Sequence, residues 1–256
     1  MIFRRLLTIA ALAAAAATAL AAPQVAPADD ALLKAYDAFR AGDPVKLQRF
    51  SGQLGAHLGG HVLAPYLEYW RLTLRLEDNP DAEVRAFLEQ QAGSYLADHL
   101  RADWLKELGK RGDWQNFDRE LPLLVRDELE IRCYAWLSRL ARADEGAHEE
   151  ARAIWREPRE LPDGCHALAN RMIDAGRVNV DDVWRRVRLL FENGQLSAAR
   201  RALVHLPAGE KHDEYLLNQA ATAPKKFLAS PPRNLGRRAV REMTLFAVVR
   251  LGRNDP

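Results

Sequence analysis

The chain has 256 residues, of which 48% are hydrophobic and 28% are charged, so it can bury a substantial core and does not belong to the disordered class. Its 37 Lys and Arg residues nearly balance its 35 Asp and Glu residues, and this excludes the strongly basic composition typical of many nucleic-acid-binding proteins. One or two domains fit this length.

Residues 1–22 differ from the rest of the chain. Arg4 and Arg5 precede a largely apolar run, and small residues follow it. This pattern predicts a secretory signal peptide, with cleavage after Ala21 as first choice and after Ala22 as second choice. An uncleaved membrane anchor is the alternative, although the run is shorter than the roughly 20 residues that span a bilayer. Without this segment, the chain has 35 basic and 35 acidic residues.

From residue 23 onward, helical periodicity is nearly continuous and strand signals are almost missing. Breaks recur about every 34 residues, and a further stop falls inside one pair of helices, at Gly194. The recurrent breaks are at Gly42, Asn79, Gly112, Gly146, Gly176, Gly209 and Gly252. Two helices of about 12 residues with their turns occupy this length. We therefore predict an all-α fold, a helical solenoid or superhelix of stacked antiparallel helix pairs, over residues 23–256.

The segment HVLAPYLEYWRLTL, residues 61–74, predicts one of these helices. Pro65 is tolerated at the first helical position, where its missing N–H needs no partner. Glu68 is then expected in the first turn, where a carboxylate interacts favourably with the helix dipole, so we predict packing and capping for it rather than catalysis. The apolar residues form two adjacent stripes, which predicts a helix wedged between neighbours. The stripes are Leu63, Tyr66, Leu67, Trp70 and Leu74, and Tyr69, Leu72 and Leu76.

Cys133 and Cys165 are the two cysteines of the chain. An even number of cysteines in an exported protein favours a disulfide over free thiols. Their separation is close to one repeat, which places equivalent helices side by side. The sequence has no CxxC motif, so a zinc site made of thiolates or a thioredoxin-type redox centre is not expected.

The C-terminal part combines a basic excess with an apolar helix face. From Pro224 onward, eight Lys or Arg residues stand against Glu242 and Asp255, which indicates either a solvated surface or contact with an anionic partner. We expect the apolar face to be partly open to water, because the residues after Leu251 resemble a turn into a further helix. Its members are Val240, Met243, Phe246, Ala247, Val249 and Leu251.

Other chemistry has little support in the sequence. His57 and His61 have the i, i+4 spacing of metal ligands, but Gly59 and Gly60 interrupt the helix that would align them, so we predict no metal site and no cofactor. Tryptophans at helical spacing are expected in the core. Trp114, which follows a Gly-Asp turn, is the one we would choose for stacking on a sugar ring. The acidic residues of turns and polar helix faces are expected to be solvated, among them Glu77, Asp78, Asp81, Glu83, Glu149 and Glu150.

Three stretches together resemble a known family. They are LGAHLGGHVLAPYLEYWRL, AEVRAFLEQ and LRADWLKELGKRGDWQNF, and they are similar to the N-terminal superhelical region of soluble lytic murein transglycosylases. The resemblance extends from about Ala31 to the end and is strongest between Leu54 and Phe117. His61-Val62 departs from it where members often have a proline after the histidine. The two cysteines also resemble a pair in that family. The matching positions are Leu63, Pro65, Tyr66, Leu67, Glu68, Tyr69, Trp104, Leu105, Leu108, Gly112, Asp113 and Trp114.

The resemblance implies a periplasmic enzyme that cleaves the MurNAc–GlcNAc bond of peptidoglycan without water and leaves a 1,6-anhydro end. In that family a helical, U-shaped region precedes a lysozyme-like domain that carries the catalytic glutamate. The Glu-Ser pair, the GLMQ segment and the AYNAG segment of that domain are absent here, so no catalytic residue is assigned. We expect a superhelical domain truncated at its C-terminal end, which by itself does not cleave peptidoglycan.

Two hypotheses about function follow. In the first, the chain is the non-catalytic part of a lytic transglycosylase and scaffolds or positions glycan strands. In the second, it is a periplasmic TPR-like scaffold that binds a protein partner in its concave face. Neither hypothesis includes nucleic acid, or a membrane after signal cleavage, as a partner.

Overall fold

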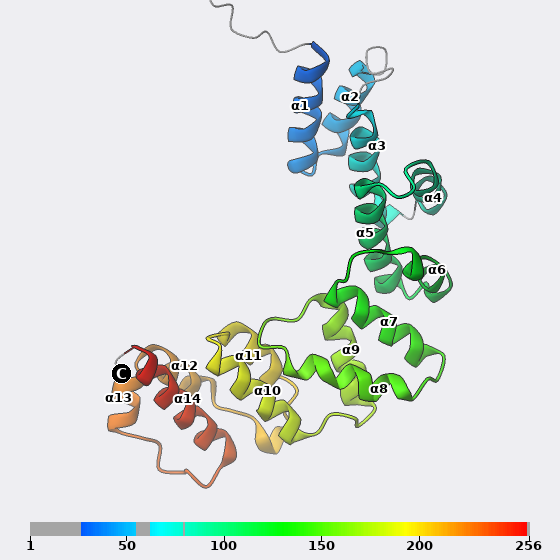
Figure 1. Cartoon of the computed structure of the whole chain (residues 1–256). Helices are drawn as coiled ribbons and strands as arrows, with labels where there is room; N and C mark the ends of the chain where they lie inside the picture. The colour runs from blue at the N-terminus through cyan, green and yellow to red at the C-terminus, as the bar shows by residue number, and fades with distance from the viewer. Residues whose placement is uncertain (1–26, 55–61, 79, 255–256) are drawn as a thin grey trace, which may run out of the picture. The chain divides into compact units, whose positions relative to one another are not determined.

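The structure is a computed structural model that describes residues 27–54, 62–78 and 80–254. The predicted signal peptide and the pair His57 and His61 lie outside the described residues. Within the described ranges every regular element is a helix, so the predicted all-α class is confirmed (Figure 1). No helix in these ranges is both long enough and apolar enough to cross a membrane.

The helices follow one another with short connections. The α-helices are α1 Pro27–Arg40, α2 Pro44–Leu54, α3 Ala64–Thr73, α4 Asp81–Gln90, α5 Tyr95–Arg111, α6 Trp114–Glu120, α7 Leu129–Ala141, α8 Gly146–Ala151, α9 Asp163–Asp174, α10 Val180–Glu192, α11 Leu196–Leu203, α12 Glu214–Thr222, α13 Pro224–Ala229 and α14 Arg238–Asn254. The 3-10 helices are η1 Leu76–Asp78, η2 Leu121–Leu123, η3 Arg152–Arg156 and η4 Ala208–Glu210. They form two compact units, one up to Pro80 and one from Asp81 onward.

In the first unit, α3 packs against α1 and α2 around an aromatic cluster. The ring of Trp70, which is 7% exposed, stacks on Phe39 with a centroid distance of 5.7 Å and meets Tyr36 and Tyr66 at 5.4 and 5.9 Å. Leu72 is completely buried. The two apolar stripes predicted for this helix are therefore packing surfaces.

In the second unit, α7 lies between α5 and α9 and contacts both. Two glycines make this close packing possible, because the ring of Tyr134 on α7 occupies the space that a β-carbon would fill at Gly109 of α5 and at Gly164 of α9. A β-carbon on Gly164 would lie 2.6 Å from the ring. The two glycines therefore let successive helices approach one another closely.

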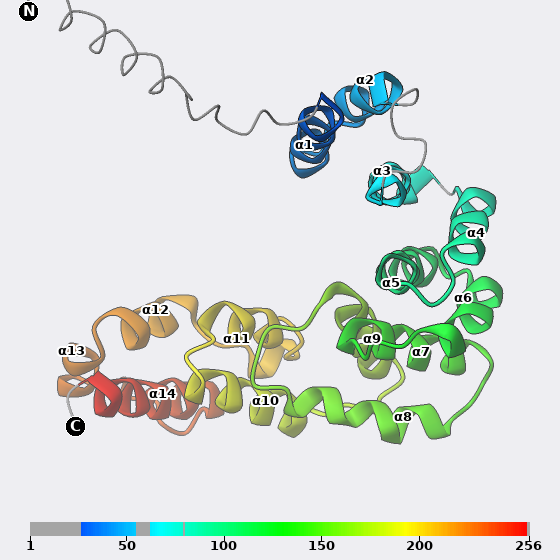
Figure 2. The same ribbon diagram turned by 45° about the horizontal axis from the view of Figure 1, so that its top comes forward.

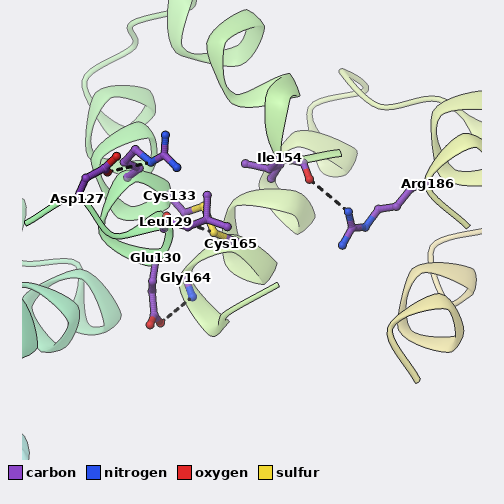
Figure 3. Close-up of a disulfide and its surroundings, with 9 residues drawn as sticks. Asp127, Leu129, Glu130, Cys133, Ile154, Gly164, Cys165 and Arg186 are labelled. Atoms are coloured by element: carbon purple, nitrogen blue, oxygen red, sulfur yellow. Dashed lines mark hydrogen bonds and ion pairs between the residues drawn. A yellow bond between two sulfur atoms is a disulfide. The ribbon is translucent and has the colours of Figure 1, made fainter. Parts of the chain in front are cut away.

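A disulfide joins the same helices. Cys133 of α7 and Cys165 of α9 are bonded, with 5.0 Å between their Cα atoms, so the predicted pairing is confirmed (Figure 3). Both cysteines are fully buried, and the sulfur of Cys165 also lies 3.5 Å from the carbonyl oxygen of Leu129. The bond connects helices that are one repeat apart in the sequence.

Four of the predicted glycine stops are confirmed. Gly42, Gly112, Gly176 and Gly194 follow helices and have φ between 65° and 72°, a conformation that glycine adopts without the strain of a β-carbon.

The stop predicted at Gly146 was placed too late. The left-handed residue after α7 is Ala143, with φ of 61°, and Gly146 begins α8. Gly209 lies in the 3-10 helix η4. The break predicted at Gly252 was wrong, because α14 continues through it to Asn254.

The C-terminal helix α14 packs against α10, α12 and α13. Figures 1 and 2 show α10 and α14 along one side of the second unit, with α11 and α12 along the other. The apolar face predicted to be open is largely covered, because Val240, Met243, Phe246 and Ala247 are at most 6% exposed. The sequence could not show that earlier helices fold back onto this face.

Candidate functional site

In the first unit, several family-motif residues pack against the core. Tyr66, Leu67 and Tyr69 are half-buried against it, and Leu63 is partly exposed just before α3. Pro65 is the second residue of that helix.

Glu68 is not where the sequence placed it. Because α3 begins at Ala64, Glu68 lies beyond the first turn and caps nothing. Its carboxylate instead accepts two hydrogen bonds from the guanidinium of Arg71, at 2.8 and 2.5 Å. The predicted capping role of Glu68 is therefore wrong, and the side chain instead forms an ion pair on the surface of the helix.

In the second unit, the motif residues also have structural roles. Trp104, Leu105 and Leu108 are fully buried in α5, and the indole Nε1 of Trp104 donates to Asp81 at 2.9 Å. Asp81, expected to be simply solvated, therefore anchors a core tryptophan. Gly112 ends α5 with φ of 70°.

Asp113 and Trp114 begin the next helix. Asp113 caps α6 by accepting from the backbone N–H of Asn116 at 3.2 Å. Burial opposes ionisation, but the hydrogen bonds from Asn116 and the charge of Arg111 outweigh it and lower the pKa of Asp113. Trp114 is half-buried, and its ring meets Phe117 edge to face.

The structure places a different tryptophan, Trp155, at a groove between η3 and α10. Two recesses, of about 390 and 400 Å³, share Trp155, Arg156 and Arg185 in their walls, and we call them together the Trp155 groove. The remaining lining residues are Glu149, Arg152, Ala153, Val178, Asp182, Arg188, Leu189 and Glu192. Each recess falls within the range of roughly 300–1,000 Å³ typical of small-ligand sites.

Trp155 is half-buried and contributes to both recesses. The guanidinium of Arg186 lies over its ring, 5.8 Å from the centroid. The indole Nε1 is buried, yet it has no acceptor among the described residues. A buried donor without a partner is uncommon in folded proteins.

The arginines of the Trp155 groove differ in their partners. Arg185 pairs with Asp182 at 3.1 Å, and Arg188 pairs with Glu242 at 2.7 Å. Arg152 makes longer contacts, at 3.5 Å to Glu149 and 3.8 Å to Asp182.

Arg156, which both recesses share, has neither an ion pair nor a hydrogen bond within the part of the chain that the structure describes. Its side chain therefore does not have to break an ion pair within the protein before it binds an anion.

Arg186 holds the adjoining wall of the groove in place. It is 4% exposed, and its guanidinium donates to the carbonyl oxygen of Ile154 at 3.2 Å (Figure 3). It also donates to the carbonyl oxygens of Glu157 and Arg159 at 2.9 and 3.1 Å. Burial lowers the pKa of Arg186, and the nearby carboxylates of Glu160 and Glu157 oppose this. One buried cation therefore fixes the irregular segment after η3 against α10.

Neither Trp155 nor Arg156 was predicted from the sequence to line a site. A usable signal was present in AIWREPRELP, where Pro158 and Pro162 interrupt helical structure directly after a tryptophan followed by an arginine. That pattern places Trp155 near a helix end, where its ring can line a surface groove. No cluster of three or more His, Cys, Asp or Glu residues suited to a metal occurs in the described ranges.

Comparison with known proteins shows what the chain is similar to. No family model matches the chain. It is 26% identical over 187 residues to a soluble lytic murein transglycosylase of Salmonella typhimurium, and 23% identical over 207 residues to one of Escherichia coli K12. These matches cover 72% and 79% of this chain but 27% and 32% of the relatives, so the chain spans about a third of their length.

Solved structures show the same fold. An inactive mutant of the lytic transglycosylase Slt from Pseudomonas aeruginosa matches with a TM-score of 0.58 and 24% identity, over 87% of this chain and 36% of that one. The 70-kDa soluble lytic transglycosylase in complex with bulgecin A matches with a TM-score of 0.58 and 18% identity, over 89% and 36%. The resemblance to part of the soluble lytic murein transglycosylases is confirmed, as is the superhelical fold.

Proposed function

We propose that this chain is the non-catalytic helical part of a periplasmic soluble lytic murein transglycosylase, and that it holds glycan strands of peptidoglycan. The observation that carries the proposal is the similarity itself, which extends over 72–79% of this chain but over 27–32% of the relatives. The relatives are murein transglycosylases by name, so murein is the substrate class proposed here.

The Trp155 groove supports the role in holding glycan. It combines an aromatic ring with an arginine that has no partner among the described residues, within recesses of small-ligand size. Aromatic rings with a few convergent polar groups are the usual composition of such sites.

The carboxyl groups support binding without cleavage. Glycoside cleavage needs a general acid, usually a carboxyl group with a raised pKa. Each described carboxyl group with a shifted pKa has it lowered, because hydrogen bonds and neighbouring cations outweigh the effect of burial. These groups are Asp43, Asp113, Asp144, Glu150, Glu160, Asp181 and Glu214.

Among the described residues, two acidic side chains are buried, and both serve as ion-pair partners. Glu120, which is 7% exposed, faces Arg101 and Arg119, and Glu242, which is 6% exposed, faces Arg188 and Arg238. Neither has the apolar surroundings that would prepare a general acid.

Export is a further part of the proposal. Residues 1–22 have the charged start, apolar run and small-residue boundary of a signal peptide, which would deliver the chain to the periplasm. Mass spectrometry of cell fractions tests this directly. A mature periplasmic form beginning near Ala22 or Pro23 is expected, and an intact Met1 terminus in the cytoplasm would refute it.

Sedimentation with purified sacculi tests the binding function. We expect the chain to sediment with intact sacculi in a saturable manner, and not in tubes without them. Failure to sediment at any sacculus concentration, combined with specific capture of a periplasmic protein, would favour the protein-scaffold hypothesis instead.

A further inference from the structure

We propose that the Trp155 groove binds a sugar that carries a single carboxylate, with the carboxylate on Arg156 and the sugar ring against Trp155. This inference rests on the proposed function and names the ligand chemistry of the same site. N-acetylmuramic acid without a peptide stem, whose lactyl carboxylate is then free, is the peptidoglycan sugar with this chemistry.

The carboxylate is assigned to Arg156 because the other arginines of the groove already contact carboxylates of the chain. Arg185 and Arg188 have partners at 3.1 and 2.7 Å, and Arg152 lies near Asp182 and Glu149. The guanidinium of Arg156 has no such partner among the described residues. A planar guanidinium binds a carboxylate through two parallel hydrogen bonds, which fix the orientation as well as the charge of the ligand.

The sugar ring is assigned to Trp155 because this side chain supplies the aromatic surface of the groove. Its ring lines both recesses and is braced by Arg186. The apolar face of a sugar can pack against such a ring.

The charge balance of the groove selects against more highly charged anions. Four arginines line it together with three carboxylates, from Glu149, Asp182 and Glu192. The carboxylates would repel a second negative charge, so a phosphate dianion or a nucleic acid fits less well than a monocarboxylate.

The indole N–H resonances of the full-length protein test this assignment. ¹⁵N-labelled protein is titrated with N-acetylmuramic acid and, separately, with N-acetylglucosamine, which lacks the carboxylate. Trp155→Phe identifies the Trp155 resonance by its loss. We expect N-acetylmuramic acid to shift that resonance. N-acetylglucosamine should bind with an affinity that is weaker by a factor of roughly ten or more.

Two arginine variants separate a specific contact from general charge. Arg156→Gln should lower the affinity for N-acetylmuramic acid by roughly tenfold or more, because it removes a charge-assisted pair of hydrogen bonds. Arg159→Gln is the matched control, since Arg159 is exposed three residues away and does not line the groove. Equal affinities of the two variants, or equal affinities of the two sugars for the wild type, would overturn the inference.

Sedimentation with sacculi distinguishes this inference from the proposed function. If the wild type binds sacculi but neither sugar shifts the Trp155 resonance, the groove assignment is wrong and the proposed binding function stands. If the wild type does not bind sacculi, the proposed function itself fails.

Discussion

Arg186 is the residue on which the wall of the Trp155 groove depends. Replacing it with methionine keeps much of the buried volume but leaves the carbonyl oxygens of Ile154, Glu157 and Arg159 without their donor. Unsatisfied buried acceptors and lost charge-assisted hydrogen bonds should lower the free energy of unfolding by about 3 kcal/mol. Urea unfolding followed by tryptophan fluorescence measures this loss.

Arg185→Met is the matched control for Arg186→Met. Arg185 is the adjacent residue, its side chain is 70% exposed, and it pairs with Asp182 at the surface. Exposed ion pairs contribute at most about 1 kcal/mol, so a small change is expected. Similar losses in the two variants would show that the buried guanidinium has no special role.

Tyr134 predicts a dependence of stability on alkaline pH. Burial, followed by the charges of Glu130, Asp163 and Glu107, raises the pKa of Tyr134 from 10.0 to about 12. The unfolded chain therefore loses this proton at a lower pH than the folded chain, and ionisation favours unfolding as the pH rises from 10 to 12. Relative to Tyr134→Phe, which has no phenol to ionise, the wild type should lose stability across this interval and then level off.

Urea midpoints of the wild type and Tyr134→Phe, measured at intervals from below pH 10 to above pH 12, check this expectation. A constant difference between the two proteins would mean that the phenol ionises equally easily in the folded and unfolded states. A difference that changes below pH 10 would assign the effect to another group.

Among the helices, α7 and α9 are connected covalently, and this predicts a loss of stability when the bond is removed. The disulfide closes a loop with a sequence separation of 32 residues. In the loop-entropy model, this restriction of the unfolded chain raises the free energy of unfolding by about 3–4 kcal/mol. The Cys133→Ala, Cys165→Ala double variant should lose about that much in urea unfolding.

The single variant Cys133→Ala is the control for the disulfide. It also abolishes the bond, so its midpoint should match that of the double variant to within the effect of one buried side chain. A single variant as stable as the wild type would contradict an energetic role for the bond.

Helix α14 was expected to be poorly covered, and its buried face now predicts the opposite. Met243 is completely buried, and Phe246 stacks on Phe191 of α10 with a centroid distance of 4.0 Å. Met243→Ala should therefore cost about 2–5 kcal/mol, as is typical of large-to-small changes in a core. Leu245→Ala, on the same helix but at a side chain that is 55% exposed, should change stability by about 0.5 kcal/mol or less.

Thermal unfolding of the two α14 variants gives the measurement. A large loss from Met243→Ala and a small one from Leu245→Ala would confirm the packing of this helix. Equal, small effects would indicate that the face of α14 is partly open to water, as the sequence suggested.

At the scale of the whole molecule, the sequence predicted the fold class better than the site. Periodic apolar residues and left-handed glycines such as Gly112 are local signals, and they correctly gave helices and many of their ends. The covering of α14 depends on contacts with α10 and α12, which are distant in sequence, so periodicity alone could not reveal it. The Trp155 groove depends on η3 lying against α10, a contact of the same kind.

The family resemblance predicted the relationship but not the chemistry of this chain. Motif residues such as Trp104 and Asp113 proved to be a core side chain and a helix cap, which many sequences of this fold need. The groove residues Trp155 and Arg156 lie outside the stretch where the resemblance is strongest. The family resemblance therefore rests on structural residues. The candidate binding residues could be identified only from the packing of the helices.

We propose that this chain binds peptidoglycan without cleaving it, and a single incubation with intact sacculi tests both parts of this proposal. Purified protein is mixed with sacculi, the suspension is sedimented, and both the bound protein and the soluble muropeptides are measured. We expect saturable sedimentation of the chain and no 1,6-anhydro-muropeptides above those of sacculi alone. Protein that stays in the supernatant, or release of anhydro-muropeptides that is lost when one glutamate of this chain is changed to glutamine, would contradict it.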